Sequence, residues 1–309
     1  MTQQADIVML GFCGWDYLAI VPRIPIDDKV QLIESLEQGG GPAATAAVTA
    51  ARLGARTAFL GKVGDDPRGG NIVAELRREG VDVSGLLVEE GATSSTAFCW
   101  IEQNTGKRSI AWQKGSARDL TPKEVPLDLV RGAKVLHLDG HQAEGASAAA
   151  EEARHAGVTV SLDAGSYSPR MDGLMKRCQV VIASEVFARD LIGRDDPEAA
   201  VRQIARCGAE VAVITRGARG CICLTADGLL RKQAFPVEVV DTTGAGDVFH
   251  GAFCVALAEG WPVERALDFA GATAALKCLR LGGRTGIPRR DTVMEFLRKS
   301  TVWQCNGCA

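Results

Sequence analysis

The sequence predicts an α/β protein with a mostly parallel central sheet, and two patterns carry this prediction. Short apolar runs alternate with amphipathic stretches through most of the 309 residues, as expected for strands joined by crossover helices. A parallel sheet built in this way is covered by helices on both faces. The second observation concerns the number of domains: the sequence has no repeats and no low-complexity linkers. We therefore expect one domain spanning residues 1–309, with one small appendage.

The regular elements follow one another in the order that this architecture requires. The predicted strands of the body are 6–11, 57–61, 134–139, 158–163, 180–183 and 211–215, and residues 237–240 read as one more. The predicted helices are 43–53, 69–79, 143–156, 197–207, 247–259 and 263–281. Each helix is long enough to return the chain to the start of a neighbouring parallel strand.

Two segments break the alternation of strands and helices. Residues 17–36 and 93–112 show period-two patterning and turn residues without a helix, which indicates hairpin pieces inserted into the body. Together they are expected to form a small β lid over an active site. Such a sheet is marginally stable alone, and Tyr17, Ile20, Phe98 and Trp100 offer apolar surface to a partner. We expect a homodimer formed through the lid.

Composition and charge exclude several classes of partner. The chain is 46% hydrophobic and 24% charged, with a formal net charge of -3, and it has no basic run, so nucleic acid is not an expected partner. Neither a leader nor a membrane-spanning stretch is evident, and we expect a cytoplasmic protein that does not bind membranes. The ten cysteines are scattered as small apolar residues. Only Cys305 and Cys308 have CxxC spacing, and we assign them no function.

The stretch VVDTTGAGDVFHGAF at 239–253 carries a chemical prediction. Gly244, Ala245 and Gly246 would form a tight turn at the start of a helix, where backbone N–H groups attract a phosphate. Asp247, in the first helical turn, would accept a proton from an attacking hydroxyl while those amides stabilise the γ-phosphoryl group. An aspartate at this position also serves as a simple helix cap, so the motif alone leaves both interpretations open.

The same stretch resembles the carboxyl-terminal signature of the PfkB, or ribokinase-like, family of carbohydrate kinases. The amino-terminal signature of that family is matched by GGGPAATAAV at 39–48 and by GKVGDD at 61–66. The resemblance covers nearly the whole chain and implies a ribokinase-like three-layer sandwich with a β lid. It also implies ATP-dependent transfer of a γ-phosphoryl group to a hydroxymethyl group of a sugar.

The resemblance further implies roles for individual residues. Asp247 corresponds to the family's catalytic base, and Gly244, Ala245 and Gly246 to its anion hole. The other implied positions are Thr215, Gly217 and Gly220 for the nucleotide, and Asp16, Gly40, Gly41 and Thr45 for the sugar. Thr45 falls where many members carry asparagine. Outside this context the glycines would read as a loop before a helix, and Asp16 as a turn residue.

The cofactors implied by the resemblance are ATP and Mg²⁺, with K⁺ in some relatives. Asp241 and Thr243 fall where those relatives bind a monovalent cation. The family's Asn-x-x-Glu motif is altered here, because Ser184 and Phe187 replace its two named residues and leave Glu185 as the nearby acid. We place Glu185 in the outer shell of a magnesium ion that is bound mainly by phosphates and water.

The substrate is the least determined part of the prediction. Within the family the chain is most similar to sulfofructose kinases, through motifs that mostly belong to shared catalytic machinery. A sulfonated sugar would require cationic groups such as Lys29 and Arg108 in the lid region; Lys114 and His141 are further candidates. The lid turn at 104–108 also resembles ketohexokinases, so a neutral ketohexose remains open.

Other readings of the same fold are a ribokinase, a fructokinase or a nucleoside kinase. Nucleosides would require aromatic stacking surfaces, which the lid region offers in Trp15, Tyr17, Phe98, Trp100 and Trp112. The non-enzyme alternative is a silent nucleotide-binding sensor. The presence of Asp247 argues against a sensor, because pure binding needs no base.

Overall fold

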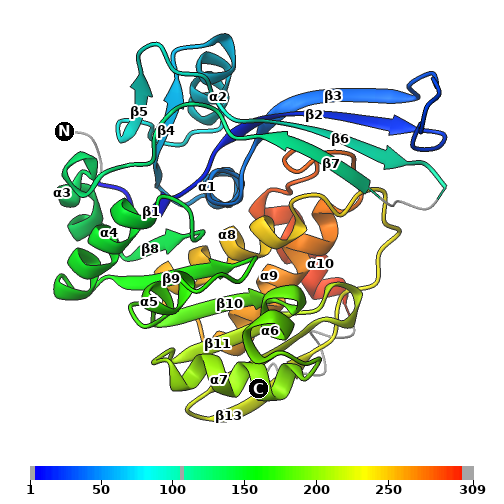
Figure 1. Ribbon diagram of the computed structural model, residues 1–309. Coiled ribbons are helices and arrows are strands. Elements are labelled where there is room, and N and C mark those ends of the chain that lie inside the picture. Colours follow the sequence, from blue (N-terminus) through cyan, green and yellow to red (C-terminus); the bar gives the residue numbers. More distant parts are fainter. Residues whose placement is uncertain (1–3, 105–107, 301–309) are drawn as a thin grey trace.

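The body of the protein is one large, mostly parallel sheet (Figure 1). The computed structural model describes residues 4–104 and 108–300. In this part of the chain the sheet has nine strands in the order β13-β12-β11-β10-β9-β8-β1-β4-β5. Strands β11 to β5 pair in parallel, and β12 and β13 join antiparallel at one edge. The strands are β1 (Ile7–Leu10), β4 (Thr57–Gly64), β5 (Leu86–Glu89), β8 (Val135–Leu138), β9 (Thr159–Ala164), β10 (Val180–Ser184), β11 (Val211–Thr215), β12 (Cys221–Thr225) and β13 (Gly228–Lys232).

Helices cover both faces of this sheet, which confirms the predicted three-layer architecture. Because side chains alternate along a strand, Ile7 and Met9 of β1 enter one core while Val8 and Leu10 enter the other. The first core is closed by α1 (Pro42–Arg52), α2 (Pro67–Arg78), α8 (Ala245–Ala258), α9 (Val263–Lys277) and α10 (Arg290–Lys299). The second is closed by α3 (Leu127–Gly132), α4 (Ala143–His155), α5 (Met171–Met175), α6 (Glu185–Ile192) and α7 (Pro197–Arg206).

Two predicted elements differ from the structure near the motif at 239–253. Residues 237–240 form no strand; Val239 and Val240 are 54% and 45% exposed, and the N–H of Val240 donates to the carbonyl of Cys278 over 2.8 Å. This segment therefore connects the β12–β13 hairpin to α8 instead of joining the sheet. Helix α9 ends at Lys277 rather than at residue 281, because the chain turns there toward Gly282, whose φ is +93°.

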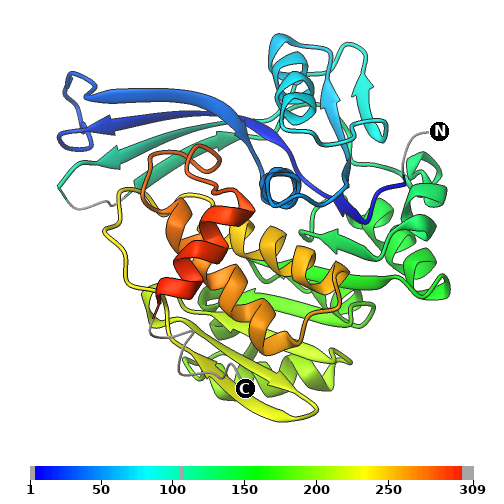
Figure 2. The ribbon, with the colours of Figure 1, turned by 180° about the vertical axis from the view of Figure 1, so that it is seen from behind.

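The second sheet is the predicted lid, and it projects from the body on the side of α8, α9 and α10 (Figure 2). Its strands are β2 (Gly14–Val21), β3 (Glu34–Gly40), β6 (Thr96–Glu102) and β7 (Arg108–Gln113), in the order β3-β2-β6-β7. Leu18, Cys99 and Ile101 pack with Leu281 on the body side. On the opposite face the rings of Tyr17 and Phe98 stack with centroids 4.9 Å apart.

One predicted lid residue lies on the other face. Ile20 was grouped with Tyr17 and Phe98 as surface for a partner, but it packs against the body-side cluster of Leu18 and Ile101. The period of two along β2 places residues 18 and 20 opposite residue 17. The outer apolar face is therefore narrower than predicted.

Within residues 4–104 and 108–300, no helix has the length and apolar content required to cross a membrane.

Candidate active site

Three carboxylates gather where parallel strands end beneath the start of α8. Asp139 directly follows β8, Asp163 is the penultimate residue of β9, and Asp247 lies in the first turn of α8. The carboxyl ends of parallel strands meet at one edge of a sheet, which is where ligands bind in open α/β folds. This edge lies beneath the lid sheet and forms the candidate site.

The turn before α8 presents unoccupied backbone donors. Gly244 has a φ of +73°, and a Cβ built on it would lie 2.9 Å from the Cα of Gly283, so glycine is required there. The N–H of Ala245 donates to the carbonyl of Thr242 over 3.1 Å. Among the described residues, the N–H groups of Gly246 and Asp247 meet no hydrogen-bond acceptor, and a Cβ on Gly246 would meet no atom within 4 Å. This cradle fits a phosphate group.

Asp247 is poised to exchange a proton near neutral pH. Burial raises the pKa of its carboxyl to about 7, with further increases from the charges of Asp163 and Asp139, while His250 and Arg284 lower it. His250 lies one turn further along α8, and its Nε2 is 3.2 Å from Oδ1 of Asp163. A base with a pKa near the working pH combines availability with proton affinity.

The predicted sugar residues line the opposite wall of the site. A Cβ on Gly40 would lie 2.0 Å from Oδ2 of Asp16, and a Cβ on Gly41, whose φ is +97°, would lie 2.4 Å from the carbonyl oxygen of Phe12. Burial raises the pKa of Asp16 to about 6, and the neighbouring charge of Arg284 lowers it. Gly40 therefore leaves room for the Asp16 carboxylate, and Gly41 leaves room for the main chain at Phe12.

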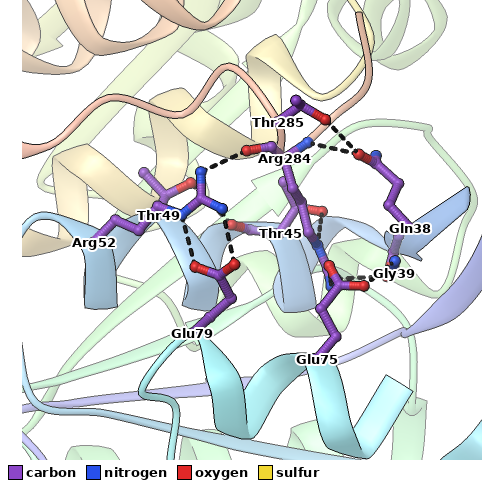
Figure 3. A network of polar contacts seen from close by, with 10 residues as sticks. Gln38, Gly39, Thr45, Thr49, Arg52, Glu75, Glu79, Arg284 and Thr285 are labelled. Carbon is purple, nitrogen blue, oxygen red and sulfur yellow. Dashed lines mark hydrogen bonds and ion pairs between the residues drawn. The ribbon is translucent and has the colours of Figure 1, made fainter. Parts of the chain in front are cut away.

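A buried arginine holds this wall in place (Figure 3). Arg284 pairs with Oε1 of Glu75 at 3.1 Å and donates to the carbonyl of Gly40 at 3.1 Å and to the hydroxyl of Thr45 at 3.3 Å. Oε2 of Glu75 in turn accepts the N–H of Gly39 at 2.7 Å. The Thr45 side chain, predicted as a sugar contact, is thus buried and bonded to Arg284.

Comparison with known proteins identifies the family. A family model described as "pfkB family carbohydrate kinase" matches residues 4–290. The chain belongs to this family. The kinase is 31% identical to ribokinase of Bacillus subtilis, over 94% of this chain and 99% of that protein. It is 30% identical to ATP-dependent ribose-1-phosphate kinase of Halopiger xanaduensis, over 94% and 97%.

Solved structures confirm the predicted ribokinase-like fold of the kinase. A putative ribokinase from Agrobacterium tumefaciens superposes with a TM-score of 0.87 at 30% identity, covering 96% of this chain and 98% of that one. Arabidopsis thaliana ribokinase complexed with ribose and ATP gives a TM-score of 0.84 at 25% identity, covering 96% and 100%. The prediction of a phosphotransferase acting on a sugar hydroxyl is confirmed with the family.

The predicted nucleotide segment of the kinase lies between β11 and β12. Thr215 ends β11, and its hydroxyl donates to the carbonyl of Ala183 over 3.3 Å. Gly217 and Gly220 have φ of +54° and +77°, and a Cβ on Gly220 would lie 1.9 Å from the carbonyl oxygen of Lys232. The backbone conformation at these two positions therefore favours glycine, and the contact of either residue with a nucleotide stays a prediction.

Glu185 forms ion pairs with two arginine side chains. Its carboxylate accepts from Arg216 at 3.1 Å and from Arg219 at 2.7 Å. A role in the outer shell of magnesium stays a prediction, and it would require this arrangement to open. Among the described residues no cluster of three or more His, Cys, Asp or Glu side chains suits a metal ion.

The two lid cations predicted to meet an anionic sugar occupy different places. Arg108, at the start of β7, donates from Nη1 to the hydroxyl of Thr242 over 2.9 Å, which brings it beside the phosphate cradle. Lys29 is exposed in the connection between β2 and β3. Residues 105–107 of the lid turn, like Cys305 and Cys308, lie outside the described part of the chain.

Sequence reasoning missed several residues that build the site. Oδ2 of Asp139 accepts the N–H of Phe12 at 2.8 Å and of Ala43 at 3.1 Å, and so joins the end of β1 to the start of α1. Asp163 and Arg284 were likewise not assigned to the site. An available signal was the aspartate at the end of each predicted strand at 134–139 and 158–163, which is the sheet edge where ligands bind.

Proposed function

We propose that this kinase transfers the γ-phosphoryl group of magnesium-bound ATP to a hydroxymethyl group of a sugar, with a ketohexose as the favoured acceptor. The observation that carries the proposal is the position of Asp247 beside the free N–H donors of Gly246 and its own backbone. Asp247 would take the proton of the sugar hydroxyl as its oxygen attacks the γ-phosphorus. The bond from that phosphorus to the bridging oxygen breaks, ADP leaves, and the cradle stabilises the charge of the transferred group.

Each component of this proposal has a matching feature in the chain. The Gly244–Gly246 turn would hold phosphate, and magnesium would arrive with the nucleotide and supply charge neutralisation there. Asp16 and the backbone at Gly40 and Gly41 would hold sugar hydroxyls opposite Asp247. The described cysteines are free thiols, which accords with a cytoplasmic location.

A substrate panel with ATP and Mg²⁺ tests the proposal. Ribose, fructose, sulfofructose and adenosine are offered to the wild type and to Asp247→Asn, and ADP release is measured together with the phosphorylated product. The variant is expected to bind ATP as the wild type does and to lose about 10²- to 10⁴-fold in kcat. Phosphorylation of adenosine alone would identify a nucleoside kinase, and ATP binding without any transfer would identify a sensor.

A sulfonated ketohexose is the finer form of this proposal, and Arg108 is the residue that favours it. Its guanidinium lies at Thr242, beside the phosphate cradle, where a planar cation would contact an anionic sugar group. Lys29 would reach the same group only through movement of the exposed β2–β3 connection. We therefore rank Arg108 above Lys29 as the determinant.

Paired substrates separate charge recognition from closure of the lid. Arg108→Met is expected to raise KM for sulfofructose by about 10- to 100-fold, the loss of one charge-assisted contact, and to leave KM for fructose within about 2-fold. Lys29→Met serves as the matched lid control. Equal responses of both sugars to Arg108→Met would assign that arginine to lid closure and would remove the sulfosugar form.

We also propose that the kinase is a homodimer formed through the outer face of the lid. Tyr17, Phe98 and Trp100 share this face with Leu32 of the β2–β3 connection, and they line one hollow. Phe98 and Leu32 are 46% and 50% exposed. Apolar surface of this kind on a small sheet is typical of an interface.

A further inference from the structure

A buried lysine contacts the loop that leads into the phosphate cradle. Lys277, the last residue of α9, is fully buried, and its Nζ donates to the main-chain carbonyl of Asp241 over 2.8 Å. The burial of an ammonium group is unfavourable unless negative groups surround it. Asp241 supplies a carbonyl oxygen directly and a carboxylate nearby, so the surroundings of Lys277 stabilise its buried ammonium group.

The Asp241 carboxylate already accepts three hydrogen bonds. Oδ1 accepts the N–H of Thr243 at 2.8 Å and its hydroxyl at 2.7 Å, and Oδ2 accepts the N–H of Gly282 at 2.9 Å. The Asp241 side chain is 3% exposed. A monovalent cation at Asp241 and Thr243, as the family resemblance implied, would have to share this carboxylate with three hydrogen-bond donors and lie close to the ammonium of Lys277. The residues present therefore do not fit a K⁺ ion at this position.

The ammonium group of Lys277 lies among charged side chains and beside the loop that precedes Gly244. Burial lowers the pKa of Lys277, while the charges of Asp241 and Asp247 raise it and that of Arg108 lowers it. The loop is further joined to the end of α9, because the N–H groups of Val240 and Asp241 both donate to the carbonyl of Cys278. One internal cation thus orders the segment that carries the turn at Gly244.

We propose that the ammonium of Lys277 supplies the positive charge that orders the Asp241–Thr243 loop, so that this kinase needs no monovalent cation. This inference rests on the proposed function for its kinetic arm only. The wild type, freed of K⁺, Na⁺ and ammonium in a tetramethylammonium buffer, is expected to change in kcat by less than about 2-fold as KCl is raised to about 100 mM. Its melting temperature is expected to be equally indifferent to KCl.

The variant Lys277→Met keeps the length of the side chain and removes its charge. Without monovalent cations it is expected to lose about 10-fold or more in kcat and in affinity for ATP. Added K⁺, ammonium or methylammonium should restore part of both losses. ATP affinity is measured by calorimetry, which requires no knowledge of the sugar.

Lys232→Met is the matched control, because Lys232 is a second buried lysine. It lies on β13, and its Nζ donates to two carboxylates of α9, Glu264 at 2.8 Å and Asp268 at 3.0 Å. This variant should lose stability with no response to added cations. The proposal is overturned if KCl raises the kcat of the wild type by more than about 5-fold. It is also overturned if Lys277→Met folds and is fully active, or if it folds and stays impaired at every cation concentration. If Lys277→Met does not fold, the wild-type titration and Lys277→Arg, which keeps the charge and should stay cation-independent, decide instead. Absence of phosphorylation with every sugar would contradict the proposed function, while the melting and ATP-affinity arms would still test Lys277.

Discussion

At the scale of single residues, the pKa of Asp247 is raised chiefly by burial and adjusted by four neighbouring residues. Asp163 on β9 and Asp139 after β8 raise its pKa, and His250 on α8 and Arg284 after α9 lower it. In the proposed mechanism the deprotonated carboxylate is the active form, so kcat/KM should fall as the pH drops below about 7. Burial and the charges of these four neighbours together therefore set the acidic limb of the pH profile.

The first prediction uses the opposite signs of these neighbours. Asp163→Asn removes a negative charge and should move the acidic limb of kcat/KM to lower pH, whereas His250→Asn removes the neighbour that lowers the pKa of Asp247 and should move it to higher pH. Each shift is expected to be about one pH unit. A pH series on both variants measures the difference, and shifts in the same direction would contradict this electrostatic account of Asp247.

At the scale of elements, the turn after α9 contacts three elements that are distant from it in sequence. Arg284 joins the end of β3 through Gly40, α1 through Thr45 and α2 through Glu75. Its side chain is fully buried, so its loss leaves the carboxylate of Glu75 without a counter-charge. Breaking a buried pair in this way is strongly destabilising.

The second prediction follows from that burial. Arg284→Met should lower the free energy of unfolding by about 3 to 5 kcal/mol, measured by urea denaturation at neutral pH. Arg56→Met, at the exposed pair with Asp6, is the control and should cost about 1 kcal/mol or less. Equal losses for the two variants would mean that the Arg284–Glu75 pair behaves like a surface pair.

The elements also show how far the sequence alone leads. The strands near 57, 134, 158, 180 and 211 and the glycine turn at Gly244 were predictable, because period and turn chemistry are local signals. The apolar spacing of 263–281 continues past Lys277, so the end of α9 depends on tertiary contacts of Gly282 that no window reveals. Arg284 and Asp139 act on segments far away in the chain, and local patterns do not identify such partners.

At the scale of the whole molecule, the lid is a second sheet with two different faces. The body-facing side is anchored by Leu281 and places Arg108 at the cradle. The outer side leaves Phe98 about half exposed beside Tyr17. In the proposed function this sheet covers the substrate, and burial of its outer side against a second copy would rigidify it.

The third prediction concerns this assembly. The wild type should sediment as a dimer at micromolar concentration, and Phe98→Glu should sediment as a monomer, because a charge on the outer face cannot be buried unpaired. Val88→Glu alters an equally exposed apolar residue on β5 and should remain a dimer. A wild type that sediments only as a monomer would contradict the proposed interface without affecting the fold.

The contact between Gly244 and Gly283 has a thermodynamic consequence. Gly283 precedes Arg284, so a single turn touches both the phosphate cradle and, through Gly40, the wall of the sugar site. A ligand that orders one of these surfaces leaves less disorder for the second ligand to remove. Occupancy by the sugar should then tighten nucleotide binding, and linkage requires the nucleotide to tighten sugar binding by the same factor. Calorimetric titrations of either ligand in the presence of the other, with a non-hydrolysable ATP analogue, would give that factor as one shared coupling constant.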